Sequence, residues 1–480
     1  MASFRLGSAP FWTDEIFSLL FARGSLHSLV AQAAADVHPP FYFFLLHWWL
    51  KMFGESELAV RALSLLPLAL SLWLIYQIAS YVFNRKVALL TAFLCAFSPV
   101  IVLYSRMARY YSLVACLMLA ALFLLMKLRG KETFFRWAAY LAVTILLFYT
   151  DYPSSAYLII LSGGLLIYFV LAEKKASTII FRWIGIIAVS VLAYLPWLTK
   201  MLATSGAMFT KHVDVDRNLG ATALVLKLIF PLYSFIFGET LFPWHYPLIA
   251  LGLLAFIASL IIAVCYCREN NNNGLPITAG LVGGTVIINA LLLSYFAKTH
   301  SFIYYPRTII FAVYLLLMLV ACGIVAGGKR VGAVLLVALL LVNGYSLLNV
   351  SRLQEYFNPF YLIPWKTVAG DIMRQARTTD RIFSDDPSLK YYLRSAEDTA
   401  GLTEIMNKDK VERFWLVLSG KDSREEQLFQ ERILRITEER YRPTTRLKYL
   451  PLDRRFVSLK AKLQKRQSYL YKLTVTLYSK

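Results

Sequence analysis

Long apolar stretches separated by short polar turns occupy most of the first 350 residues of this chain. Each of about ten stretches approaches the roughly 20 residues that a helix needs to cross about 30 Å of hydrocarbon. The pattern therefore predicts a polytopic α-helical membrane protein. We expect spans at residues 61–83, 87–104, 110–127, 134–150, 153–172, 181–198, 246–267, 276–297, 302–326 and 331–348.

Two further apolar stretches do not fit a membrane span. Residues 39–53 are short and rich in Trp and Tyr, which favours a helix that lies at the membrane interface. Residues 221–240 contain Lys227, Pro231 and Glu239, so we expect an interfacial or re-entrant segment there. The first 60 residues then form an outer loop with interfacial helices, ahead of a membrane domain over residues 61–348.

The pattern changes character after about residue 349, where charged residues become frequent and apolar runs become short. The periodicity predicts helices at 365–376 and 423–440. Short β-favouring runs at 381–384, 413–419 and 469–477 predict strands. Residues 349–480 are therefore expected to fold as a small α/β domain.

Composition and charge support this picture and suggest an orientation. Of the 480 residues, 58% are hydrophobic, and the formal net charge is +21. Lys and Arg are spread between the apolar stretches and over the tail, which argues against a nucleic-acid partner and for contact with membrane lipids. Short basic loops mark the cytoplasmic side, so we expect a cell inner (plasma) membrane protein whose C-terminal domain lies outside. These loops are residues 84–86, 127–136, 173–182, 267–268 and 328–330.

Several ionisable residues fall at the outer ends of the predicted spans or in outer loops. Charged groups at membrane depth are costly, so they favour a functional site. Simpler roles remain open: Asp14 and Asp151 could cap helices, and Arg61 could anchor at the interface. The candidates are Asp14, Glu15, His38, Arg61, Arg106, Arg109, Asp151 and Arg307.

Three segments carry a resemblance to a known family. They are FRLGSAPFWTDEIFS (4–18), ADVHPPFYFFLLHWWLKMFGESELAVRALS (35–64) and YSRMARYYSL (104–113). In order and spacing they resemble the N-terminal half of the C-type (GT-C) membrane glycosyltransferases. The similarity is strongest to the bacterial protein-O-mannosyltransferase and aminoarabinose-transferase-like branch, which is glycosyltransferase family 39-like. Arg307, in YYPRT, resembles an Arg-Tyr step of a late span, with Thr308 in place of the Tyr.

This sequence departs from the family pattern at two places. Family members have a transmembrane helix before the RLGS-like segment, whereas here Arg5-Leu6-Gly7 follows Met1 almost at once. We expect an in-frame apolar segment upstream of the present start. Asp151 stands where relatives often carry a His, which adds a second carboxylate.

The resemblance implies an enzyme that transfers a hexosyl or pentosyl group from a polyprenyl-phosphate donor to a lipid, glycan or protein hydroxyl. It implies Asp14 as general base with Glu15 beside it, and Arg109 and Arg307 on the donor phosphate. Asp151 is a further catalytic candidate, and His38, Arg106 and Arg61 are further phosphate-binding candidates. Some relatives bind a divalent cation and others do not; no residues of this sequence are assigned to a metal.

A transporter or flippase for a lipid-linked sugar is the alternative function. Such proteins tend to show paired halves and helices broken at the membrane midplane. The sequence shows no internal repeat, and its acidic pair is expected at a membrane surface. A lipid-binding scaffold is a third interpretation, which the density of charged motifs on one side disfavours.

Overall fold

The computed structural model describes residues 2–36, 38–173, 178–211, 221–296, 306–354, 356–357, 361, 363–399, 401–402, 411–419, 424–449 and 473–480. The chain forms two compact units. A membrane unit comprises Met1–Leu6 and Ser18–Arg352, and a C-terminal unit comprises Gly7–Phe17 and Leu353–Lys480.

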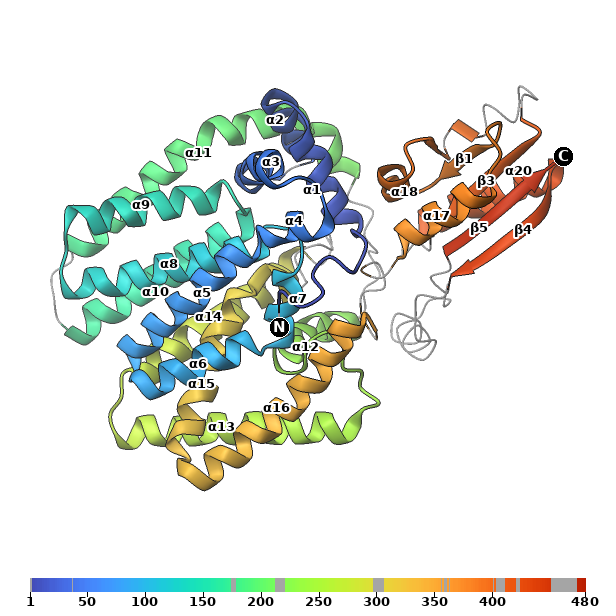
Figure 1. Cartoon of the computed structure of the whole chain (residues 1–480). Helices are drawn as coiled ribbons and strands as arrows, with labels where there is room; N and C mark the ends of the chain where they lie inside the picture. Colours follow the sequence, from blue (N-terminus) through green and yellow to red (C-terminus); the bar gives the residue numbers. More distant parts are fainter. Residues whose placement is uncertain are drawn as a thin grey trace. The chain divides into compact units, whose positions relative to one another are not determined.

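The membrane unit is built from helices that follow the apolar pattern of the sequence. Helices α5, α8, α9 and α10 run side by side, and α13 packs against α15 and α16 (Figure 1). The helices are α1 (Thr13–Arg23), α2 (Leu26–Ala35), α3 (Phe41–Phe53), α4 (Glu57–Ala62), α5 (Leu65–Val82), α6 (Arg85–Ala96), α7 (Pro99–Ser105), α8 (Tyr111–Gly130), α9 (Phe134–Phe148), α10 (Tyr152–Glu173), α11 (Thr178–Lys211), α12 (Ala221–Phe237), α13 (Tyr246–Glu269), α14 (Gly274–Phe296), η2 (Pro306–Ile309), α15 (Phe311–Ala326) and α16 (Gly328–Arg352).

Seven helical segments of the described residues are long and apolar enough to cross a membrane. They are α4–α5, α8, α10, α11, α13, α14 and α16, and each lies within a predicted span or overlaps one. The prediction of a multi-pass helical membrane protein is therefore confirmed. Helices α9 and α15 are apolar but shorter, and residues 302–305 of the predicted ninth span lie outside the described residues.

The predicted second span is not straight. Helices α6 and α7 meet at an angle of 58° and together are long and apolar enough to form one broken span. The break falls at Ser98-Pro99, because proline disfavours helical geometry in the residue before it. Pro99 then begins α7 in the first helical turn, where its missing N–H costs nothing. The bend directs α7 toward the turn that carries Arg106 and Arg109.

Helices α13 and α15 pack unusually close together at Gly323 of α15. A Cβ atom on Gly323 of α15 would lie 1.7 Å from the backbone oxygen of Ser259 in α13. Only glycine permits this approach, as in other membrane helix pairs. Helix α15 is apolar on all sides and nearly all of it is buried, as expected for a helix at the centre of a bundle.

Helices α3 and α12 coincide with the two stretches that were predicted not to span. Both are helical, and neither is a candidate span among the described residues. Their placement at the membrane interface stays a prediction.

The C-terminal unit contains a five-stranded mixed sheet among its described residues, in the order β2-β1-β3-β5-β4. Alternate residues of β3 face opposite sides: Trp415 packs with α17, and Phe414 belongs to the core that includes Ile433 of α20. The predicted elements at 365–376, 381–384, 413–419 and 423–440 are confirmed. The elements are α17 (Trp365–Gln375), β1 (Arg381–Ser384), α18 (Pro387–Tyr392), β2 (Ala396–Asp398), β3 (Arg413–Leu418), α20 (Arg424–Arg440), β4 (Arg442–Tyr449) and β5 (Leu473–Ser479).

The N-terminal segment Gly7–Phe17 packs with the C-terminal unit. The backbone N–H of Phe11 donates to the Tyr392 hydroxyl (2.7 Å), and the Ser388 hydroxyl donates to that of Thr13 (3.3 Å). The Trp12 ring lies edge-on to that of Tyr361, with 4.7 Å between the ring centroids. Contacts between residues distant in the sequence therefore join Gly7–Phe17 to the C-terminal unit, and the expected domain boundaries at 60 and 348 stay a prediction.

Candidate functional site

The turn between α7 and α8 presents Arg109 inside the membrane unit. The Ser64 hydroxyl donates to the backbone oxygen of Met107 (2.7 Å) and approaches that of Arg109 (3.4 Å). The Arg109 N–H donates to Met107 O at 2.8 Å. These bonds fix the backbone at Arg109, so the direction of its side chain is set by the fold.

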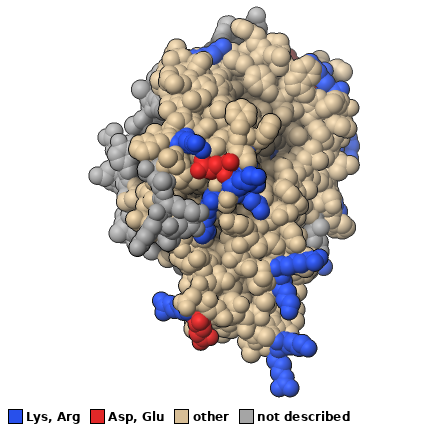
Figure 2. Space-filling view, turned by 90° about the vertical axis from the view of Figure 1, so that its left-hand side faces the viewer, with Lys and Arg blue, Asp and Glu red and all other residues tan. Residues whose placement is uncertain are grey.

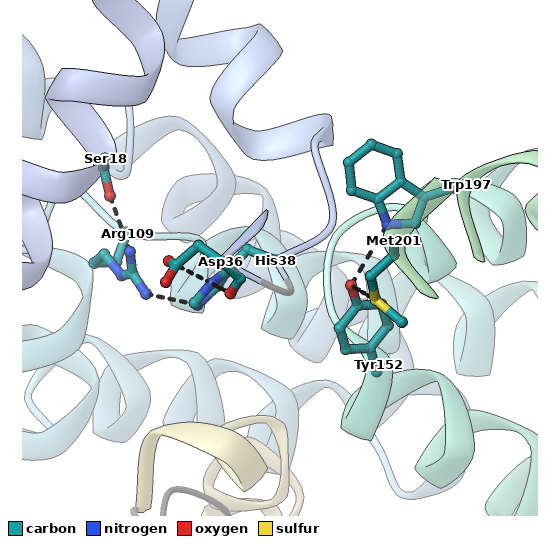
Figure 3. A network of polar contacts seen from close by, with 7 residues as sticks. All are labelled: Ser18, Asp36, His38, Arg109, Tyr152, Trp197 and Met201. Atoms are coloured by element: carbon teal, nitrogen blue, oxygen red, sulfur yellow. Dashed lines mark hydrogen bonds and ion pairs between the residues drawn. The ribbon is translucent and has the colours of Figure 1, made fainter. Parts of the chain in front are cut away.

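The Arg109 guanidinium is buried, with 6% of the residue exposed. Its Nη1 donates to the Ser18 hydroxyl at 3.1 Å, and its Nη2 lies 3.4 Å from His38 Nε2 (Figure 3). The guanidinium carbon lies 5.0 Å from the centroid of the Tyr110 ring. A buried cation is costly without partners of this kind. The site therefore holds a positive charge in a shielded position.

The contacts of His38 indicate which ring nitrogen carries its proton. Its Nδ1 lies 2.8 Å from the Asp36 carbonyl oxygen and 3.0 Å from an Asp36 carboxylate oxygen. Both partners accept, so Nδ1 is assigned as the donor. Nε2 is then left to accept from Arg109, which has only donors. Arg109 therefore donates to His38, and His38 donates to Asp36, so the hydrogen bonds run from the guanidinium through the imidazole to the carboxylate.

Asp151 lies at the start of α10 and belongs to the same cluster. Its Oδ2 accepts from the backbone N–H (2.9 Å) and hydroxyl (2.5 Å) of Ser154, which is a helix-capping arrangement. Burial raises the pKa of Asp151, and the hydrogen bonds from Ser154 and the neighbouring Arg109 charge oppose that rise. The structure thus brings Asp151 together with two of the predicted phosphate-binding residues.

Contacts on both sides of Asp151 position its backbone. The Phe41 N–H donates to Tyr149 O at 2.9 Å, which ties the His38–Pro40 turn to this segment. On the α11 side, Trp197 Nε1 lies 3.4 Å from the Tyr152 hydroxyl, which donates to Met201 Sδ at 2.9 Å (Figure 3). The start of α10 is therefore held from both sides.

Arg307 lies in η2 and shares an aromatic neighbour with Arg109. Its guanidinium carbon is 5.6 Å from the centroid of the Tyr111 ring, and that of Arg109 is 6.0 Å from the same centroid. The structure therefore gathers both predicted phosphate ligands around Tyr111, the first residue of α8.

Glu239 was not predicted as a site residue, and the structure places it close to this group. Its carboxylate accepts a hydrogen bond from Tyr104, whose ring lies 5.4 Å from that of Tyr111. Burial raises the pKa of Glu239 to about 7; the Tyr104 bond and the Arg307 charge oppose that rise. The signal that could have found it is a lone carboxylate in an apolar stretch. Ser18, the partner of Arg109, carried no such signal.

Arg61 and Arg106 bind backbone of the N-terminal residues. Arg61 Nη1 donates to Leu6 O at 3.0 Å. Arg106 donates from Nη1 to Phe4 O (2.6 Å) and from Nη2 to Arg5 O (3.1 Å). These contacts give both residues a role in fixing the chain start, and their role in phosphate binding stays a prediction.

Asp14 and Glu15 belong to the segment that packs with the C-terminal unit. Helix α1 begins at Thr13, so Asp14 lies inside the first turn and is not the residue that caps the helix. Glu15 is buried and accepts from the Trp12 N–H at 3.2 Å, as the acidic partner of a capping box does. Their approach to Arg109 and Arg307 stays a prediction.

Metal-ligating side chains do not gather in the part of the chain that the structure describes. No group of three or more His, Cys, Asp or Glu residues there could hold a metal ion. The need for a divalent cation is therefore not decided by these residues.

The sequence of residues 37–199 matches the profile of the family described as dolichyl-phosphate-mannose-protein mannosyltransferase. No curated protein matches the chain by sequence. The matched region contains His38, Arg61, Arg106, Arg109 and Asp151, but not Asp14, Glu15 or Arg307.

Solved structures of low sequence identity share the fold. ArnT from Cupriavidus metallidurans in the apo state matches with a TM-score of 0.54 at 12% identity, covering 92% of this chain and 87% of ArnT. ArnT bound to undecaprenyl phosphate matches with a TM-score of 0.52 at 12% identity, with coverage of 99% and 96%.

An archaeal structure also matches. AglB from Archaeoglobus fulgidus, an oligosaccharyltransferase in complex with an inhibitory peptide and a dolichol-phosphate, has a TM-score of 0.50 at 13% identity. The match covers 86% of this chain and 66% of AglB. The chain is therefore a multi-pass membrane protein with the GT-C fold of ArnT, and its residues 37–199 match the mannosyltransferase family.

Proposed function

We propose that this chain is a glycosyltransferase that moves a sugar from a polyprenyl-phosphate donor to a hydroxyl group. The family match of residues 37–199 and the fold shared with undecaprenyl-phosphate-bound ArnT support this assignment. The observation that carries it is the buried Arg109, held by Ser18 and His38 beside Asp151 and sharing Tyr111 with Arg307. Two guanidinium groups at the ends of apolar helices suit a phosphate whose lipid chain extends into the membrane.

The arginines would act on the leaving group. When the bond between sugar C1 and the phosphate oxygen breaks, the electron pair stays on that oxygen, and its negative charge grows. A guanidinium at a fixed position in a shielded site stabilises that charge as it forms. Arg109 is already oriented by two contacts, so little rearrangement is needed. Arg307 is the second candidate, and His38 positions Arg109 through its Nε2.

A carboxylate would act on the acceptor. The acceptor oxygen bonds to C1 and releases its proton, which a carboxylate takes as general base. We assign this role to Asp14, on the strength of its place in the FWTDEIFS segment. Glu15 supports the helix that carries Asp14 through its bond to Trp12. Asp151 supplies the second negative charge beside Arg109 and His38.

The proposal also covers the acceptor and the side of the membrane on which transfer occurs. The hydroxyl belongs to a lipid, glycan or protein, and the transferred group is a hexose or a pentose. The basic loops at the other ends of the spans support an outer location of the site and of the C-terminal unit, in the inner (plasma) membrane.

Release of undecaprenyl phosphate tests this function whatever the sugar is. Purified protein in detergent would be incubated with a panel of undecaprenyl-phosphate sugars and a cell-envelope extract that contains the lipids, glycans and proteins of the source cells. Mass spectrometry should detect undecaprenyl phosphate together with an acceptor that has gained the sugar. Product formation should require both the donor and the acceptor extract. Intact donor after incubation with every sugar and acceptor would contradict the proposal.

The alternative, a flippase for a lipid-linked sugar, predicts a different product. In proteoliposomes, a flippase would move intact donor between leaflets and release no undecaprenyl phosphate. The broken span α6–α7 is the feature that favours it, because transporters use interrupted helices. The same mass-spectrometric assay separates the two functions.

A further inference from the structure

A cavity of about 370 Å³ lies at the opposite end of α8 from Arg109. Its lining includes Tyr81 and Val82 of α5, Arg129 and Gly130 of α8, and Gly274 and Ile277 of α14. This volume is within the range of about 300–1,000 Å³ that small-ligand sites occupy. None of these residues belongs to the proposed active site.

The length of α8 places the cavity at the other membrane surface. Helix α8 runs for 20 residues from Tyr111 to Gly130, and an α-helix rises about 1.5 Å per residue. Arg129 therefore lies about 27 Å along the helix from the first residue of α8, close to the roughly 30 Å thickness of the hydrocarbon core. The cavity is thus at headgroup depth, across the bilayer from the Arg109 cluster.

Two exposed phenylalanines follow the loop that begins at the cavity residue Gly130. Phe134 and Phe135 begin α9, directly after the loop from α8, and are 80% and 82% exposed. Large apolar side chains exposed together on a membrane protein are suited to contact with lipid. Lipid is therefore available next to the cavity.

The cavity carries positive charge. The Arg129 guanidinium carbon lies 4.7 Å from the centroid of the buried Phe169 ring, so the side chain is oriented by α10. Lys127 Nζ lies 5.3 Å from the ring centroid of Tyr81, which itself lines the cavity. The nearby carboxylate of Glu132 is engaged by Arg182 (2.5 Å). Figure 2 shows the side of the molecule that is at the left in Figure 1, and this side carries far more basic than acidic side chains.

We propose that this cavity binds the phosphate headgroup of an anionic phospholipid. Arg129 would contact the phosphate, and Lys127 would add charge from the same helical turn. Val82 and Ile277 offer an apolar wall for the start of the acyl chains. Basic pockets between membrane helices bind anionic lipid headgroups in this way. The inference does not depend on the proposed transferase function.

The test is lipid binding by native mass spectrometry. The full chain, delipidated in detergent, would be titrated with phosphatidylglycerol, with phosphatidylcholine and with inorganic phosphate. We expect phosphatidylglycerol to bind and phosphatidylcholine to bind at least about fivefold more weakly, because its net charge is zero. Arg129→Gln should weaken phosphatidylglycerol binding about tenfold, as expected for loss of a charge-assisted hydrogen bond.

A matched variant and a competitor make the result decisive. Arg330→Gln removes the same charge from exposed residue 330 at the start of α16 and should leave binding within about twofold. Arg129→Lys should restore part of the affinity, and thermal unfolding would verify that each variant is folded. Equal effects of Arg129→Gln and Arg330→Gln would overturn the proposal. So would equal binding of both lipids, or displacement of phosphatidylglycerol by millimolar inorganic phosphate, which would indicate a soluble anion.

Discussion

The Tyr104 hydroxyl donates a hydrogen bond to the Glu239 carboxylate, and both side chains are buried in the membrane unit. Tyr104 comes from α7, the second half of the broken span, and Glu239 follows α12. The Tyr104 ring also packs against the Tyr111 ring, which the guanidinium groups of Arg109 and Arg307 both approach. A proton-sensitive group therefore lies next to the proposed phosphate-binding residues.

The raised pKa of Glu239 predicts a pH dependence of stability. Its pKa is about 7 in the fold, against an ordinary value of 4.5. Between these values the folded state holds a proton that the unfolded state has released, so stability falls as pH rises from 4.5 to about 7. Glu239→Gln should remove this part of the dependence. Thermal unfolding in detergent across pH 4.5–8 would measure it; parallel profiles for variant and wild type would refute the assignment.

Turnover should require both the positive charge and the planar guanidinium geometry of Arg109. Arg109→Gln should lower the rate of undecaprenyl phosphate release about 100-fold or more, as for other groups that stabilise a developing anion. Arg109→Lys should recover only part, because an ammonium cannot contact Ser18, His38 and phosphate in the geometry of a guanidinium. Arg182→Gln, which breaks a surface pair with Glu132, is the control and should retain activity. Full activity of Arg109→Lys would show that the fork geometry is irrelevant.

Two substitutions of Asp151 separate its role as a helix cap from its role in the proposed active site. Asp151→Ser keeps a residue that caps helices well but removes the negative charge beside Arg109 and His38. We expect its thermal stability to change little and its turnover to fall about tenfold or more. Asp151→Ala should in addition lose about 1 kcal/mol of stability with the cap. If Asp151→Ser is as active as wild type, Asp151 is a helix cap only.

Gly238 controls the position of Glu239. Its φ of +76° disfavours any residue with a Cβ, and an added Cβ would lie 2.6 Å from Pro99 Cβ and 2.7 Å from Ser346 Oγ. Gly238→Ala should therefore cost about 1–3 kcal/mol and displace Glu239 from Tyr104. Gly344→Ala in α16 is the matched control, since its Cβ would meet no heavy atom within 4 Å. Thermal unfolding would be measured for both variants. Equal midpoints for Gly238→Ala and Gly344→Ala would contradict a special role of Gly238.

The apolar pattern of the sequence predicted the membrane helices well, because crossing a bilayer requires about 20 apolar residues in any context. It did not predict the 58° bend between α6 and α7, although the Ser98-Pro99 step carried the signal. Strand β4 was also missed. Its sequence, RPTTRLKY, is charged and contains a proline, as edge strands often do, and it lies at the edge of the sheet.

The candidate site was predicted in part. Arg109, Arg307, His38 and Asp151 are ionisable residues at the ends of apolar stretches, and the structure brings them together. Ser18 and Glu239 could not be assigned to them, because their contacts join residues 91 and 135 positions apart in the chain. The packing of Gly7–Phe17 with the C-terminal unit was missed for the same reason: only the folded chain brings Phe11 to Tyr392.

The most direct test of the proposed chemistry is a comparison of donor binding and turnover in Asp14→Asn. The substitution keeps the size of the side chain and removes its ability to take a proton at neutral pH. If Asp14 is the general base, the variant should bind undecaprenyl-phosphate sugar as wild type does and release undecaprenyl phosphate at least about 100-fold more slowly. Wild-type release by a folded Asp14→Asn variant would contradict the mechanism.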